Sequence, residues 1–268
     1  MIRRYLLVFG SLVLAAICLI SCDPSLNAVD EDAYDAYIIY SQALEKYLSN
    51  TNRAFQVCFH QEYFDINTSK ISSINSVLDI KYVNDDDSAR KIEVKSKWKS
   101  GNDEEYVETQ ECVYIDNMNY QIDKSFNSDS VRYSKIQYSI REEVLTNMIH
   151  VGLFTELSYV DIRKFSSKTT NGMIELSFTL GGGSLAAWQT SFNAIDLEEA
   201  ECNIVIDPDG QIKSTSCSFE YKTKDANGDI HPAKYFYTMD VLQYGGVIIE
   251  TPNPAEYEDV SEFLVNNS

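Results

Sequence analysis

The segment Ile92-Glu93-Val94-Lys95-Ser96-Lys97-Trp98 decides the fold class of this 268-residue chain. Its apolar and polar residues alternate strictly, so a β-strand formed here has one dry face and one wet face. Such a strand belongs in an antiparallel sheet that is covered on one side only, because strands of parallel sheets are usually apolar on both faces. The segment therefore predicts a one-sided antiparallel sheet.

The same two-residue period recurs on both sides of this segment. Phe55, Val57 and Phe59 share one face of an upstream strand, and Leu78 and Ile80 share one face of the next. Further strands are predicted over residues 106–122, 158–166, 172–180, 202–206, 212–221, 235–241 and 247–250. Tight turns between the last of these make the closing third an antiparallel meander. The result is a sheet of about ten strands, which must curl or be covered because its dry face is large.

Three other segments repeat their apolar residues every three or four positions, which is typical of amphipathic helices. The first spans 31–49 and starts among acidic residues, where a helix favours negative charge. The second opens on a capping box at 139–142, and the third spans 184–195 after the run Gly181-Gly182-Gly183. The sequence thus predicts an α+β fold in which three helices cover the sheet. Because no linker or repeat divides it, residues 31–268 are predicted to be one domain with an acidic C-terminal tail.

The N-terminal segment has the features of a targeting signal. Arg3 and Arg4 precede an apolar run that ends at Ile20, which is typical of a secretory signal and short for a membrane-spanning helix. Leu19-Ile20-Ser21-Cys22 is similar to a bacterial lipobox, in which the chain is cut before the cysteine. This resemblance implies a signal peptide at 1–21, diacylglycerol on Cys22 and a tether at 22–30. The protein would then be held by lipid on the extracytoplasmic face of a bacterial cell envelope.

The composition excludes some partners. Asp and Glu number 41 against 22 Lys and Arg, a net charge of -19. Nucleic acid is excluded because phosphate binding needs clustered basic residues, and an acidic protein is repelled by anionic lipid headgroups. Much of the negative charge falls on alternate strand positions, turns and the tail. It therefore marks the wet face of the sheet.

Besides the acylated Cys22, four cysteines would remain in the mature chain: Cys58, Cys112, Cys202 and Cys217. They allow three disulfide pairings, among which spacing does not choose. Four buried free thiols are an equal alternative, since free cysteine is among the most buried residue types. No C-x-x-C motif is present, so the spacing suggests neither a zinc site nor a thioredoxin-type site.

The sequence offers little for catalysis. His60, His150 and His231 stand in unrelated contexts, and no nucleophile motif or phosphate-binding loop accompanies them. Asp225-x-Asn227-x-Asp229 has the spacing with which a calcium loop begins, but the later bidentate acid is missing, so a hairpin turn is predicted. We expect no enzyme activity, metal or cofactor.

The order of these elements resembles the lipoprotein-carrier superfamily, which includes LolA and LolB and their LppX/LprG-type relatives. The closing stretch from Tyr244 to Pro252, followed by Tyr257, is similar to the end of many lipoproteins of this group. The resemblance implies a strongly curved antiparallel sheet, an incomplete barrel closed by helices. It also implies a hydrophobic cavity that receives acyl chains.

The expected function follows from that resemblance: reversible binding of a lipid, an acyl chain or a lipoprotein without covalent chemistry. The cavity lining is predicted to come from one face of the strands and from the second and third helices, at Phe55, Val57, Phe59, Leu78, Ile80, Val94, Trp98, Val144, Met148, Trp188 and Phe192. Each of these is alternatively an ordinary core residue. The alternative function is a non-carrier envelope protein that binds an unknown protein partner or senses envelope state.

Overall fold

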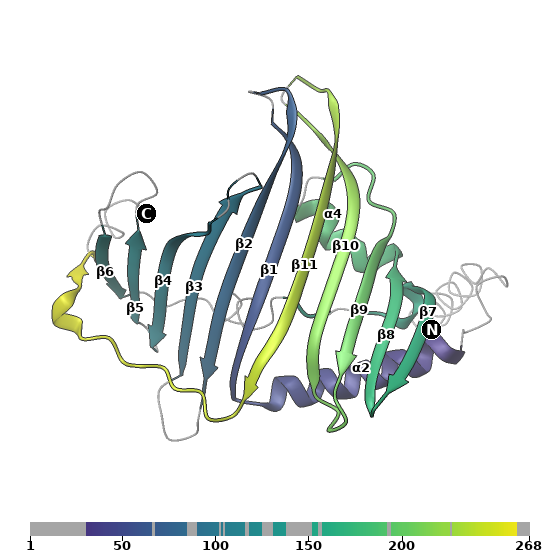
Figure 1. Ribbon diagram of the computed structural model, residues 1–268, viewed down its shortest axis with the longest axis horizontal. Coiled ribbons are helices and arrows are strands. Elements are labelled where there is room, and N and C mark those ends of the chain that lie inside the picture. Colours follow the sequence, from purple (N-terminus) through teal and green to yellow (C-terminus); the bar gives the residue numbers. More distant parts are fainter. Residues whose placement is uncertain are drawn as a thin grey trace, which may run out of the picture.

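The computed structural model describes residues 31–65, 68–84, 90–101, 103, 105–115, 118–124, 131–137, 152–154, 157–191, 194–225 and 227–261. These residues form a single large sheet of 12 strands, in the order β12-β6-β5-β4-β3-β2-β1-β11-β10-β9-β8-β7 (Figure 1). The strands are β1 Asn52–Asp65, β2 Lys70–Val83, β3 Lys91–Ser100, β4 Val107–Ile115, β5 Met118–Lys124, β6 Val131–Gln137, β7 Ile162–Thr170, β8 Met173–Leu180, β9 Ala200–Ile206, β10 Ile212–Lys224, β11 Ile230–Tyr244 and β12 Glu258–Asp259.

The predicted curved antiparallel sheet is confirmed. Neighbouring strands are antiparallel except β12, which pairs parallel with β6. Strands β7 and β12 form the two edges, so among the described residues the sheet stays open and the barrel is incomplete. The sheet has two strands more than the expected ten. Residues 106–122 form two strands, β4 and β5, and β6 and β12 were not predicted, while the predicted strand at 247–250 does not form.

Helix α2, Glu31–Ser49, has the predicted bounds and runs across the lower ends of the strands on one side of the sheet (Figure 1). Its sheet-facing stripe is buried and consists largely of alanine: Ala33, Ala36 and Ala43 stand beside Tyr40 and Tyr47. Small side chains at these positions let the helix axis approach the strands closely, while the two tyrosines fill the remaining depth. We call the side of the sheet that α2 contacts the inner face.

A buried arginine closes the C-terminus of α2. The Arg53 guanidinium donates to the carbonyl oxygen of Tyr47 at 3.2 Å and also to that of Asn50. It lies over the rings of Tyr47 and Tyr82, with its carbon 4.3 and 4.8 Å from their centroids. A cation at this end satisfies free carbonyl groups and opposes the helix dipole. The contact fixes the junction between α2 and β1.

The prediction of three covering helices is wrong in its count for the described residues, of which only α2 forms a long helix. The predicted helix at 184–195 is a 3₁₀ turn, Gly182–Leu185, followed by the six-residue α4, Ala186–Ser191. The Asp161 carboxylate accepts hydrogen bonds from the Ser184 amide at 2.9 Å and hydroxyl at 2.7 Å, so Ser184 is bonded to a distant residue instead of capping a helix. The predicted second helix, from 139, lies outside the described residues apart from Gly152.

The outer face of the sheet carries a second, smaller core. Residues 245–260, which we call the C-terminal strap, leave β11 and run past β2, β3 and β4 to the edge at β6 (Figure 1). Val247 and Ile249 of the strap are buried against Val83, Val113 and Tyr120. The predicted strand at 247–250 is wrong, because this segment is extended without forming a strand pair. It is held by side chains, such as Asn52, whose Oδ1 accepts from the Val247 amide at 2.7 Å.

No helix in the described part of the chain has the length and apolar character needed to cross a bilayer.

Candidate functional site

Helix α2 presents a second apolar stripe beside the one that packs on the sheet. Tyr37, Leu44 and Leu48 follow one another at the spacings that place side chains on one side of a helix. Tyr37 and Leu44 are half-buried, and Leu48 is 39% exposed. This stripe is therefore apolar surface that the described sheet covers only in part.

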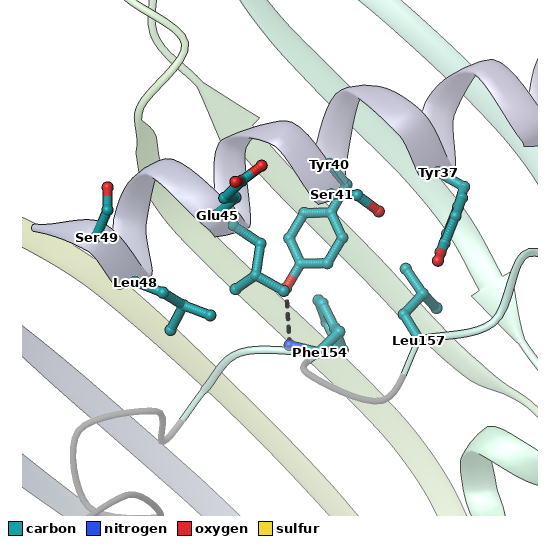
Figure 2. Close-up of a pocket in the computed structure, with 9 residues that line it drawn as sticks. Tyr37, Tyr40, Ser41, Glu45, Leu48, Ser49, Phe154 and Leu157 are labelled. Carbon is teal, nitrogen blue, oxygen red and sulfur yellow. Dashed lines mark hydrogen bonds between the residues drawn. The ribbon is translucent and has the colours of Figure 1, made fainter.

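A groove of about 540 Å³ lies along this stripe (Figure 2). The wall opposite α2 consists of Phe154 and Leu157, which belong to the connection between β6 and β7. The full lining is Tyr37, Tyr40, Ser41, Leu44, Glu45, Leu48, Ser49, Phe154 and Leu157. Its size is within the range of about 300–1,000 Å³ that small-molecule sites occupy.

One buried hydrogen bond holds the two walls together. The Phe154 amide donates to the Tyr40 hydroxyl at 2.9 Å (Figure 2). The Phe154 ring also lies 6.1 Å from the ring of Tyr40 and 6.0 Å from that of Phe178 on β8, both edge to face. Burial raises the pKa of Tyr40 far above its usual range, so this phenol remains a neutral hydrogen-bonding group. These contacts hold Tyr40 and Phe154 in place at the inner end of the groove.

The outer rim of the groove is polar. Glu45 and Ser49 are exposed on α2, and Ser49 donates to the Lys46 carbonyl oxygen at 2.9 Å. Apolar walls with a polar rim suit an amphiphile, whose chain enters the groove while its head stays in water. The lining contains no cysteine or histidine.

The strand residues predicted to line a cavity lie together on the inner face, but none of them lines this groove. Phe55, Val57 and Ile80 are completely or almost completely buried, and the ring of Phe55 packs 6.3 Å from that of Tyr47 on α2. Phe59, Leu78, Val94 and Trp98 are half-buried, and the first three pack against the same core. Phe55, Val57 and Ile80 therefore belong to the core that packs against α2.

The other predicted residues lie outside what the structure describes. Val144, Met148, Phe192 and the lipid-attachment residue Cys22 lie outside the described residues, as does the side chain of Trp188. Conversely, sequence reasoning missed Leu48, Phe154 and Leu157 as site residues. The spacing of Tyr37, Leu44 and Leu48 was a usable signal, because it makes a second helix stripe beside the sheet-facing one.

Two further hollows are lined in part by charged residues. One of about 720 Å³ is lined by residues that include His60, Glu62, Glu201 and Lys234. Another of about 630 Å³ lies between the C-terminal strap and a row of ion pairs on the outer face, such as Lys81 with Glu93 at 2.6 Å. In the described part of the chain, no group of three or more His, Cys, Asp or Glu residues is placed to hold a metal ion.

The predicted turn at Asp225 is confirmed. Its carboxylate accepts from the backbone amides of Asn227 at 2.8 Å and Asp229 at 2.9 Å, which closes the hairpin between β10 and β11. His231 lies 3.1 Å from the same carboxylate and stacks on Phe64. His60 is bound to Asn75 at 2.9 Å on the outer face, while His150 lies outside the described residues.

No family model matches the chain, and no curated protein matches it in sequence. Solved structures do match. The Mycobacterium tuberculosis lipoprotein LppX is 11% identical, with a TM-score of 0.35, and the match covers 85% of this chain and 98% of LppX. An outer membrane lipoprotein-sorting protein domain from Vibrio parahaemolyticus is 8% identical, with a TM-score of 0.21 and coverages of 83% and 95%.

A DUF1329 family protein from Desulfovibrio piger also matches, at 7% identity and a TM-score of 0.25, over 83% of this chain and 96% of that one. The fold and the groove define a class: an incomplete antiparallel barrel with an apolar groove beside its covering helix. The matched structures include a lipoprotein and a lipoprotein-sorting domain.

Proposed function

We propose that this protein is a membrane-anchored, extracytoplasmic lipoprotein that binds an acyl chain or another slender lipid in the groove beside α2. The observation that carries the proposal is the groove itself: about 540 Å³ between two apolar walls, with a polar rim. Binding would be reversible and driven by burial of apolar surface. The chain of the lipid would lie along Leu44 and Leu48, with its head in water beyond the polar rim.

Filling the groove tests where the lipid binds. In protein lacking residues 1–22 and freed of lipid, Leu48→Trp is expected to weaken binding of a fluorescent long-chain fatty acid by about tenfold, which is about 1.4 kcal/mol. Leu48 is partly exposed, so the larger ring can enter the groove without disturbing the core. The dissociation constant is read from the anisotropy of the probe.

The matched control is Gln42→Trp, which places the same side chain on an exposed position of α2 that does not line the groove. It is expected to leave the affinity unchanged. Equal weakening by both variants, or no effect of Leu48→Trp, would place the lipid elsewhere. Absence of uptake by the unaltered protein would refute lipid binding.

The proposed anchor is Cys22, and it is supported by the lipobox-like sequence that precedes it. In a bacterial host given radiolabelled palmitate, the full chain should carry label and sediment with membranes, because two or more acyl chains hold a protein stably on a bilayer. Cys22→Ala should lose the label completely and leave an uncut precursor. Cys18→Ala, within the segment that would be removed, should keep it. Label on the Cys22→Ala variant would overturn the anchor.

A further inference from the structure

Two cysteines face one another in the inner core. Cys202 on β9 and Cys217 on β10 are direct register partners in the antiparallel ladder. Their sulfur atoms are 3.5 Å apart, and each residue is 1% exposed. Both are free thiols in the structure.

Their backbone positions fit a disulfide without movement of the strands. Directly opposite residues of an antiparallel pair have Cα atoms about 4.5 or 5.5 Å apart, depending on the hydrogen-bonding pattern. A disulfide needs a Cα separation of roughly 4.4–6.8 Å, so both kinds of pair qualify. Closing the bond requires only side-chain rotation that brings the sulfurs from contact to bonding distance.

The other described cysteines are excluded as partners. Cys58 lies on the outer face of β1, between the inner-face residues Val57, which is buried, and Phe59, which is half-buried. Cys112 is on β4, three strands away from β1 in the sheet order and farther from β9 and β10. Adjacent strands are about 4.8 Å apart, so Cys112 is too far from each of the other three for a disulfide.

We propose that Cys202 and Cys217 form a cross-strand disulfide, and that Cys58 and Cys112 remain thiols. Register thus selects a single disulfide, and it leaves two thiols in place of a second one. That the bond forms in the cell rests on the proposed export of the chain to an oxidising compartment; that it can form at all depends only on the ladder.

The oxidant is a thiol-exchanging disulfide, either a protein or a small molecule. One cysteine thiolate attacks a sulfur of that disulfide and releases one thiol, and a mixed disulfide results. The second cysteine loses its proton and attacks the mixed disulfide, which releases the second thiol. In balance, two S–H groups lose two protons and two electrons, and one external disulfide becomes two thiols.

The order of folding and oxidation follows from burial. Burial and the neighbouring Cys217 raise the pKa of the Cys202 thiol far above its usual range, so the folded protein holds almost none of the reactive thiolate. Oxidation therefore takes place before the strands are covered. The bond would then tie together the two strands that flank the turn at Asp209, whose carbonyl oxygen accepts from Lys46 of α2.

Refolding tests the pairing outside the cell. Protein lacking residues 1–22 is reduced, unfolded in denaturant and refolded with reduced and oxidised glutathione, then quenched in acid. Remaining thiols are labelled in denaturant and located by peptide mass spectrometry. We expect Cys58 and Cys112 to be labelled almost fully, and Cys202 and Cys217 to be linked and to accept label only after reduction. The same reagent added to folded, reduced protein should link them at least tenfold more slowly.

Two variants make the result independent of folding yield. Cys202→Ala should leave Cys217 free to be labelled, while the control double variant Cys58→Ala, Cys112→Ala should keep the link. Labelling of both Cys202 and Cys217 in refolded protein, or links that involve Cys58, would overturn the proposal. Either result leaves the lipid-binding measurement unaffected, because the groove contains no cysteine.

Discussion

Phe55→Ala is expected to lower the free energy of unfolding by about 3–5 kcal/mol. The ring of Phe55 is fully buried, pairs across the ladder with Ile80 and Val241, and packs edge to face on Tyr47 of α2. Its removal would leave a void between helix and sheet that neighbouring side chains cannot fill, because alanines already hold α2 close to the strands. Urea denaturation of the mature domain measures the change.

Phe59→Ala provides the matched comparison. Phe59 is on the same strand and face, four residues further along, but only half-buried. We expect its loss to cost about half as much, since a partly exposed ring contributes less buried area. A small cost for both variants would mean that this face borders an open cavity. The two variants together therefore distinguish a packed core from the lining of a cavity. The sequence predicted both residues to line the same cavity.

The second large effect is expected in the C-terminal strap. Ile249→Ala should lower the free energy of unfolding by about 2–3 kcal/mol, because Ile249 is 4% exposed and fills the small core of the outer face with Val83 and Tyr120. The neighbouring Ile248 is 77% exposed. Ile248→Ala should change the stability by less than about 0.5 kcal/mol.

The two substitutions remove the same atoms from adjacent residues, so helix or strand propensity cannot explain a difference between them. Equal, small effects would show that the strap contributes little to stability. Equal, large effects would show that Ile248 is also buried in solution. Circular dichroism during urea denaturation measures both variants under identical conditions.

Much of the sheet could be predicted because the alternation of apolar and polar residues that indicates a strand lies within the strand itself. From Ile92 to Trp98, the polarity of each residue indicates on which face of the strand it lies. The structure places Ile92 and Glu93 on opposite faces of β3, and a different layer covers each of them. The bounds of α2 are equally local, since acidic residues, an apolar period and a terminal lysine all lie within it.

The failures share one cause, which is that partners far along the chain decide the outcome. Val247 to Glu250 has the composition of a strand, yet its side chains find a second core and its backbone joins no ladder. Residues 184–195 have a helical period, but Ser184 lies in a 3₁₀ turn and is bound by Asp161, and the α-helix that follows has only six residues. The pattern of apolar residues indicates which side chains are buried. It does not indicate which other segment of the chain covers them.

Sequence alone determined the class of this protein: an acidic chain that forms a curved antiparallel sheet with one covered face, behind a lipobox-like N-terminus. It also supplied four cysteines and one apolar surface without saying which residues meet. Only the tertiary structure decided that Phe55 and Val57 are filled core, that the groove lies between α2 and Phe154, and that Cys202 faces Cys217. The physical reason is that polarity and period are properties of neighbouring residues, whereas register, contact and volume arise when segments more than a hundred residues apart, such as Tyr40 and Phe154, pack together.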